Sequence, residues 1–203
     1  MSGLYITGYH DFSTQGISQL HKLIFGDIYD WAGAFRIINI SKREPLLAGK
    51  SVWYSNCDTI DKELDELWRS INRIDWSALE ESMFLEQAVS WFSKLWRIHP
   101  FREGNTRTVI ALMTFFFEEY GYTIDRNYLA ENAAIVRDAL VFCCLDQASE
   151  PEHFRAILNH AIHAKEDTSY DDHPLSVPDH YKAAPHEYTE AYDSDVYYHP
   201  QTN

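Results

Sequence analysis

The hydrophobic residues of the chain recur mostly at spacings of three and four positions, which is the period of one face of an α-helix. Segment 14–31 places such residues at Ile17, Leu20, Ile24, Ile28 and Trp31. Segment 56–72 repeats the pattern at Ile60, Leu64, Leu67, Trp68 and Ile71. Both segments are therefore predicted to be amphipathic helices that bury one face.

Two more strongly apolar segments flank a short polar stretch in the middle of the chain. The first opens at Ser77 and Glu80, whose spacing is that of a capping box, and it ends before Pro100. The second begins near Asn105 and ends at Tyr120-Gly121. Because both segments are rich in large apolar side chains, they are predicted to be central helices of the core.

The rest of the pattern completes a helical fold with one exception. Further helices are predicted at 125–147 and after a second candidate capping box at 149–152. Segment 35–54 instead alternates apolar and polar residues around turn-forming ones, which predicts a short β-hairpin. The predicted fold class is thus all-α, a helical bundle with a small hairpin.

The composition changes near Ala164. Residues 165–203 contain nine acidic residues against two lysines, together with six tyrosines and four prolines. A segment with so few aliphatic residues cannot build its own core. We therefore predict one domain at 1–164 and an acidic, tyrosine-rich tail at 165–203, either disordered or folded back over the domain or a partner.

Composition and charge narrow the class of protein. With 203 residues, 45% of them hydrophobic, the chain suits a globular protein. A net charge of −14 argues against binding to nucleic acid or to anionic membranes, and no apolar run is long enough for a membrane span. The start lacks signal-peptide features, and the three cysteines form no disulfide or metal pattern. These features predict a cytoplasmic protein, with secretion into a host cell as the alternative.

The stretch "HPFREGNTR", residues 99–107, lies between the two central helices. The first N–H groups of a helix that begins near Asn105 have no partners inside that helix, so together with the helix dipole they form an anion site. Gly104 allows a ligand to approach the backbone closely. Glu103 would repel a bare phosphate, but it suits Mg²⁺ held between a carboxylate and phosphate oxygens.

Two further side chains complete a set for transfer chemistry at phosphorus. Arg107 lies one helical turn further and can neutralise charge on outer phosphates. His99 is the group of this stretch that can take a proton near neutral pH. Taken singly, each residue has an ordinary explanation as a cap, a solvated charge or a turn. Together, in this order and spacing, they indicate phosphate-transfer chemistry.

The stretch resembles the signature of the Fic family, His-Pro-Phe-x-(Asp/Glu)-Gly-Asn-(Gly/Lys)-Arg. Upstream, "LHKLIFGDIYDWAGAFRIINISK" (20–42) is similar to the helix and flap that precede this signature in the family. The resemblance covers residues 4–164 and implies a Fic-type helical bundle, so that 1–164 is a Fic domain. The seven matching positions are His99, Pro100, Phe101, Glu103, Gly104, Asn105 and Arg107.

The resemblance implies a protein adenylyltransferase, which moves AMP from ATP to the hydroxyl of a Tyr, Ser or Thr in a target protein. His99 would then deprotonate that hydroxyl, and Glu103 would hold Mg²⁺ on the phosphates. Asn105 would orient the α-phosphate, and Arg107 would stabilise the pyrophosphate leaving group. The phosphate-binding set implied in this way is Gly104, Asn105, Thr106 and Arg107.

Two positions depart from the family pattern. Thr106 stands where the family has Gly or Lys, and Ile110 stands where many active members have a second arginine. Members that phosphorylate their targets instead carry Ala at the position of Gly104 and Lys at that of Thr106, so these residues favour AMP transfer. A Fic-fold phosphotransferase using another nucleotide chemistry and a catalytically weak binding protein remain the alternatives.

Two partners follow from the resemblance. The hairpin would act as a flap that docks the target through its exposed edge, and the residues expected there are Ile38, Asn39, Ile40, Ser41 and Lys42. Family members are inhibited by a helix with a (Ser/Thr)-x-x-x-Glu-(Gly/Asn) motif, of which the chain has no clear copy. The resemblance therefore leaves two cases, a separate antitoxin-like inhibitory chain or no inhibition of this kind.

Overall fold

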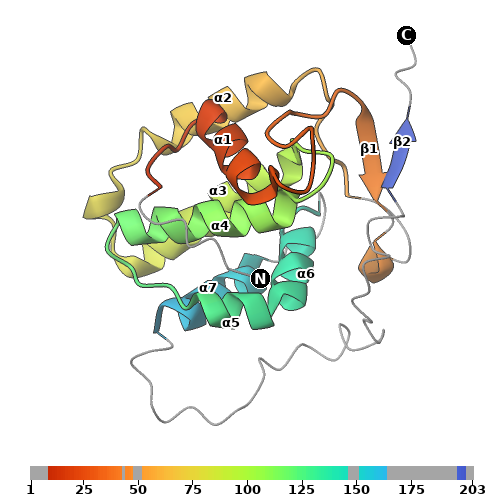
Figure 1. Ribbon diagram of the computed structural model, residues 1–203. Helices are drawn as coiled ribbons and strands as arrows, with labels where there is room; N and C mark the ends of the chain where they lie inside the picture. Colours follow the sequence, from red (N-terminus) through yellow and green to blue (C-terminus); the bar gives the residue numbers. More distant parts are fainter. Residues whose placement is uncertain (1–8, 43, 48–51, 146–150, 164–195, 200–203) are drawn as a thin grey trace.

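A computed structural model describes residues 9–42, 44–47, 52–145, 151–163 and 196–199 of the chain (Figure 1). These residues form a helical bundle with one two-stranded sheet at its side, so the predicted all-α fold class is confirmed. The helices are α1 (Thr14–Phe25), α2 (Ile60–Ile71), α3 (Glu81–Ile98), α4 (Asn105–Glu119), α5 (Arg126–Glu131), α6 (Ala133–Cys143) and α7 (Pro151–His163). The strands are β1 (Asn39–Lys42) and β2 (Val196–His199), and short 3₁₀ helices lie at Pro45–Leu47 and Trp76–Ala78.

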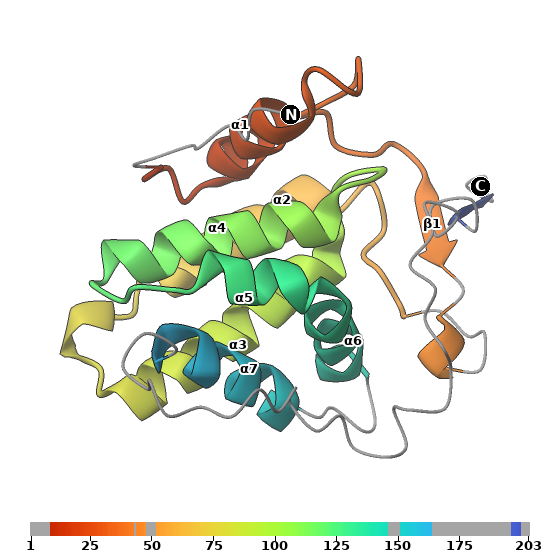
Figure 2. The same ribbon diagram turned by 60° about the horizontal axis from the view of Figure 1, so that its bottom comes forward.

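The core is built around α3 and α4. Helix α3 packs against α2, α4, α6 and α7, and α4 packs against α1, as the two views of the bundle show (Figures 1 and 2). An aromatic cluster fills the junction between them, with Phe116 in contact with Phe84, Trp91 and Phe92. The expectation that these two helices are central is confirmed, and the polar stretch between them is therefore fixed at both ends.

Three predicted helix boundaries are wrong. Helix α1 ends at Phe25 rather than near position 31, and Ile28 is 63% exposed. The segment predicted as one helix at 125–147 is divided at Asn132 into α5 and α6. Ser77 caps no helix, because its hydroxyl donates to Asp75 within a 3₁₀ turn and α3 begins four residues later. The second candidate capping box begins outside the described residues, at 149–150.

The predicted hairpin is also wrong in its second strand. Strand β1 forms, but its partner is β2 in the tail, with Asn39 opposite His199 and Lys42 opposite Val196 in an antiparallel register. The described residues after β1 turn into a 3₁₀ helix and then run without strand structure from Val52 to Ser55. The proline at the start of that 3₁₀ helix has no N–H to donate to a sheet ladder, which disfavours a second strand at this point. Apart from β2, residues 165–203 lie outside the described part of the chain.

Among the helices of the described residues, none combines the length and the apolar character that crossing a lipid bilayer requires. This agrees with the absence of a long apolar run in the sequence.

Candidate active site

The loop 99–104 between α3 and α4 is shaped by two left-handed residues. His99 ends α3 with φ 51° and ψ 58°, a conformation that few non-glycine residues adopt. Gly104 precedes α4 with φ 79°. A loop with such a turn at each end folds back tightly, so His99 and the start of α4 are held on the same short segment.

The His99 ring is buried, with 2% of the residue exposed. Nδ1 lies 3.1 Å from the backbone oxygen of Trp96. Because a carbonyl oxygen only accepts, Nδ1 carries the proton and Nε2 carries the lone pair. Nε2 is buried and has no hydrogen-bond partner among the described residues. The geometry therefore presents an unshared basic nitrogen, which is what a general base needs.

Burial is the main reason that the pKa of His99 lies well below its ordinary value of 6.5. The cationic side chains of Lys42, Arg36 and Arg137 lower this pKa further, and the bond to Trp96 opposes them. The imidazole is thus neutral at physiological pH, in the form that accepts a proton.

Arg36 clamps the end of α3 and was missed by the sequence reasoning. Its buried guanidinium donates from Nε to the His99 oxygen over 2.8 Å and from Nη1 to the Ile38 oxygen over 2.8 Å. Its Nη2 donates to the oxygen of Ser55, and its backbone N–H donates to the oxygen of Pro100 over 2.8 Å. Arg36 alone therefore connects the loop 99–104, the segment that leads into β1 and the segment that precedes α2.

Asn105 stabilises the loop through both groups of its side-chain amide. Its Oδ1 accepts from the backbone N–H of Phe101 over 2.9 Å, and its Nδ2 donates to the Phe101 oxygen over 2.8 Å. The Phe101 side chain is fully buried and stacks on the His21 ring at 3.8 Å between centroids. These contacts make Phe101 the anchor of the loop.

His21 is a second residue that the sequence reasoning missed. Its Nδ1 accepts from the backbone N–H of Gly33 over 2.9 Å, so its Nε2 carries the proton and donates to the backbone oxygen of Glu103 over 3.0 Å. Burial lowers the pKa of His21, which favours this neutral tautomer. The backbone of Glu103 is thereby fixed to α1, which restricts the positions that its carboxylate can reach.

The Glu103 carboxylate faces β1. Its Oε2 lies 3.8 Å from Nζ of Lys42, and the two side chains are only 14% and 16% exposed. Among the described residues there is no cluster of three His, Cys, Asp or Glu side chains that would cage a metal ion. A single carboxylate beside a helix start without a side-chain cap fits Mg²⁺ instead, because this ion is commonly held by one or two carboxylates and substrate phosphates.

The start of α4 fits an anion. Gly104 offers no side chain to cap the first N–H groups of the helix. A Cβ on Gly104 would lie 2.5 Å from the Phe25 ring, so the backbone at this position packs directly against that ring. The Arg107 guanidinium is exposed and lies 4.6 Å from the centre of the same ring. Backbone donors and a cation therefore lie on one surface at this helix end.

The two departures from the signature have local explanations. Thr106 Oγ1 accepts from Trp96 Nε1 over 2.9 Å, so its hydroxyl is turned toward the end of α3. Ile110 lines a largely apolar cavity of about 480 Å³ between α1, α4, α5 and α6, with Arg107 and Arg126 at its edge. Thr106 thus serves the packing of the loop, and an apolar wall stands where many members carry arginine.

The residues expected in the flap are all buried or half-buried, and most of them hold the strand in place. Ile40 is buried, and Lys42 reaches Glu103. Asn39 Oδ1 accepts from the backbone N–H of Cys57 over 2.8 Å, and the Ile38 oxygen is bound by Arg36. Ser41 is half-buried in the strand. The structure therefore brings the end of β1 against the loop through Lys42.

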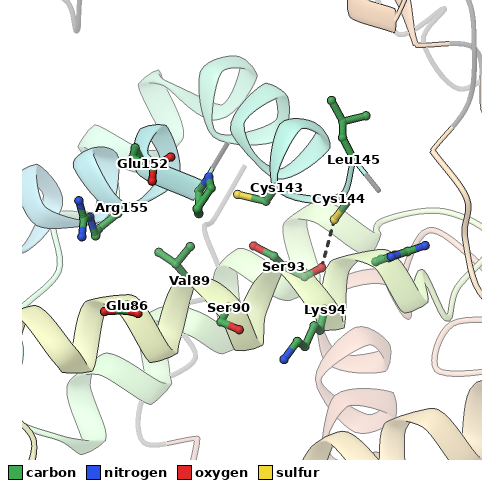
Figure 3. A pocket seen from close by; sticks show the side chains of 12 residues that line it. Glu86, Val89, Ser90, Ser93, Lys94, Cys143, Cys144, Leu145, Glu152 and Arg155 are labelled. Atoms are coloured by element: carbon green, nitrogen blue, oxygen red, sulfur yellow. Dashed lines mark hydrogen bonds between the residues drawn. The ribbon is translucent and has the colours of Figure 1, made fainter. Parts of the chain in front are cut away.

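A separate pocket of about 570 Å³ lies between α3, the end of α6 and the start of α7 (Figure 3). None of its lining residues belongs to the stretch 99–107. Cys144 Sγ donates to the Ser93 oxygen over 3.3 Å, and burial raises the pKa of the Cys143 thiol to about 11. Neither cysteine forms a disulfide, and Cys143 is a neutral thiol at physiological pH, so it is not an activated nucleophile.

The loop and the elements around it match a known protein family. A model of the Fic/DOC family matches residues 11–117. The chain belongs to the Fic/DOC family. The match includes α1, β1, α2, α3 and most of α4, which are the elements that build the Fic loop and its surroundings.

Two curated relatives are similar over this Fic region. The chain is 35% identical over 112 residues to a probable protein adenylyltransferase, y4lH, of Sinorhizobium fredii, across 54% of the chain and 55% of that protein. It is 29% identical over 114 residues to the protein adenylyltransferase VbhT of Bartonella schoenbuchensis, across 56% of the chain and 23% of VbhT. The chain thus spans about half or less of the length of these relatives.

Solved Fic domains share the fold. The N-terminal Fic domain of Bep8 from Bartonella sp. 1-1C aligns with a TM-score of 0.63 at 18% identity, covering 78% of the chain and 77% of that domain. BepC of Bartonella tribocorum, solved with bound AMPPNP, aligns with a TM-score of 0.59 at 23% identity, covering 72% and 74%. At these identities the likeness is one of fold.

Proposed function

We propose that the chain is a protein adenylyltransferase that transfers AMP from ATP to a hydroxyl side chain of a target protein. The observation that carries the proposal is the buried, unshared Nε2 of His99 next to an uncapped helix start. The curated relatives named as adenylyltransferases and the AMPPNP bound in BepC support ATP as the donor. The activity belongs to the Fic domain at 1–164, with 165–203 as an appendage.

The first chemical step uses His99. The target hydroxyl gives its proton to Nε2, and its oxygen forms a bond to the α-phosphorus of ATP. The bond from that phosphorus to the bridging oxygen of the β-phosphate breaks, and pyrophosphate leaves. Because Nδ1 keeps its proton on the Trp96 oxygen, the imidazole becomes a cation while its ring stays in place.

The phosphates would lie at the start of α4. The backbone N–H groups after Gly104 would bind them, Thr106 would contribute through its backbone, and Arg107 would balance charge on the leaving pyrophosphate. Asn105 would act on the α-phosphate by holding this loop. Glu103 is the residue that would hold Mg²⁺, which when bound supplies positive charge to the phosphates.

The partners belong to the same proposal. A protein target would pair with the edge of β1 that β2 does not occupy, because the main chain of a strand edge can bind an extended segment of any sequence. An inhibitory antitoxin-like chain would have to cover the exposed Arg107. The cytoplasm of the producing cell is the proposed location.

A labelling experiment tests the function. The purified chain is mixed with a cell lysate and Mg²⁺, and with ATP labelled either at the α-phosphate or at the γ-phosphate. Relative to the same lysate without the purified chain, AMP transfer predicts additional protein-bound label from the α-position only, because kinases of the lysate already transfer the γ-phosphate. Additional transfer of the γ-label would instead identify a phosphotransferase, and no additional label from either position would leave a binding protein.

The matched variants are His99→Ala and His163→Ala. His163 lies on α7 and contacts Glu81 at the far end of α3 from His99, so its loss should leave the rate unchanged. His99→Ala should abolish labelling and retain nucleotide binding, because the proton is taken in the transition state. Unchanged labelling in His99→Ala would refute the assignment of the base.

A further inference from the structure

Three side chains next to His99 form a buried cluster that none of the steps above uses. Glu44 follows β1, Tyr54 precedes α2, and Arg137 lies on α6. Arg137 Nη2 lies 2.6 Å from Glu44 Oε2, and these side chains are 12% and 0% exposed. Tyr54 Oη donates to Glu44 Oε1 over 3.3 Å. The cluster therefore joins three parts of the chain that are distant in sequence.

Tyr54 connects this cluster to His99. Its ring covers one face of the imidazole, with 4.1 Å between the ring centroids and 33° between the planes. Trp96 meets the same imidazole edge-on at 5.2 Å and 89°. One ring over the face and one against the edge restrict the rotation of the imidazole, so Nε2 points in a single direction.

The ion pair of Glu44 with Arg137 also affects the electrostatic environment of His99. The groups that face His99 are Lys42 from β1, Arg36 from the segment before it, Arg137 from α6 and Tyr54. Three of these are cations, which oppose the formation of an imidazolium. Glu44 offsets Arg137 directly, and Asp138 lies further from it, at 3.6 Å. A buried pair of this kind contributes little net stability, but removal of one member leaves an uncompensated charge.

We infer that Glu44, Tyr54 and Arg137 are positioning residues for His99. Tyr54 fixes the orientation of the imidazole, and the ion pair of Glu44 with Arg137 fixes Tyr54 and balances the charge near Nε2. The inference rests on the proposed function in one respect, which is that His99 acts as the base. Beyond that function, the inference gives a role to three residues that connect the end of β1 with α6 and that lie beside His99.

The first test concerns the ring. Tyr54→Phe keeps the stacked ring and should retain the rate of AMP transfer within about threefold, whereas Tyr54→Leu should lower kcat at least about tenfold with the KM for ATP unchanged. The matched control is Tyr122→Leu, because Tyr122 is half-buried on Phe84, roughly 21 Å along α3 from Ile98. If Tyr122→Leu lowers kcat as much as Tyr54→Leu does at equal thermal stability, the positioning role is refuted.

The second test uses the sign of the charge. Glu44→Gln removes the nearest counter-charge of Arg137, leaves Asp138 at 3.6 Å, and should move the acid limb of the pH–rate profile to lower pH, by about half a unit or more. Arg137→Gln leaves the carboxylate and should move it to higher pH. The double variant should restore the parent profile. A merely structural role predicts that both single variants lose activity with no opposite shifts, and that result would overturn the inference.

A spectroscopic test separates the inference from the proposed function. In the full chain labelled with ¹⁵N-histidine, and with His99→Gln for assignment, His99 should show a protonated Nδ1 and an unprotonated Nε2. Tyr54→Leu should give a mixture of tautomers or a broadened signal, and Tyr122→Leu should match the parent. This result would support the cluster even if no AMP transfer were found. An unchanged His99 signal in Tyr54→Leu would refute the cluster even in an active enzyme.

Discussion

Replacing Gly104 with alanine should destabilise the fold more than the same replacement at Gly121, and the difference should come from Phe25. Gly104 has φ +79°, and a Cβ there would lie 2.5 Å from Cε2 and 2.6 Å from Cζ of Phe25. Gly121 has φ +85°, but nothing lies within 4 Å of its Cβ position. The two replacements therefore share the cost of a left-handed backbone and differ in the contact with the ring.

The magnitudes follow from these two contributions. A residue with a Cβ costs about 1–2 kcal/mol in the left-handed conformation, which is the whole loss expected for Gly121→Ala. Phe25 is 1% exposed and its ring lies 4.7 Å from that of His21, so it cannot easily move aside. Forcing an extra methyl group into such a site costs about 1–3 kcal/mol more. Gly104→Ala should thus lower the free energy of unfolding by about 2–5 kcal/mol.

Urea titrations followed by tryptophan fluorescence measure these losses for the parent and the two alanine variants. Adding Phe25→Leu to Gly104→Ala should cost less than the sum of the separate replacements, because the smaller side chain removes the clash. Equal losses at Gly104 and Gly121 would show that the Phe25 ring yields freely, and the reasoning would then fail.

Three further changes have defined outcomes. Glu103→Ala should abolish the Mg²⁺-dependent gain in nucleotide affinity, and calorimetric titrations with equal affinity in the parent with and without Mg²⁺ would contradict the assignment. Deletion of residues 166–203 removes β2 and should lower AMP transfer to a protein target more than nucleotide affinity, whereas a higher rate would show that the tail obstructs the site. The free energy of unfolding should fall as the pH drops below about 6.5, because His99 binds a proton there in the unfolded chain but resists it when folded. Urea titrations at about pH 5.5 and 7.5 should show a smaller difference in His99→Gln.

Much of the fold and of the loop could be predicted because the signals are local. The apolar period and Pro100 mark where α3 ends, and Tyr120-Gly121 marks the end of α4. The stretch 99–107 is contiguous, so its residues are brought together by one turn rather than by distant packing. The predicted helix boundaries at Ser77 and Asn132 are wrong because the polar side chains there can form local hydrogen bonds that compete with those of a continuous or capped helix.

The missed residues act over long distances in sequence. Arg36 binds the backbone of His99 63 positions away, and His21 binds that of Glu103 82 positions away. Both use backbone oxygens as partners, and a backbone oxygen leaves no trace in the sequence. An arginine within the alternating apolar and polar residues of segment 35–54 was the available signal for Arg36. The second strand of the sheet was missed for the same reason, because its pairing depends on a segment at 196–199.

The pairing of β1 with β2 also sets a time order for a chain that is being synthesised. Residues 39–42 emerge early, but their antiparallel neighbours at 196–199 are added more than 150 residues later. About 94 residues separate Asn105 from the end of β2, so at 5–20 residues per second there are roughly 5–19 s during which a ribosome-bound chain can already hold His99 and the start of α4 without the completed sheet. Strand β1, whose Lys42 reaches Glu103, is thus among the last parts of the described structure to reach its final hydrogen bonding.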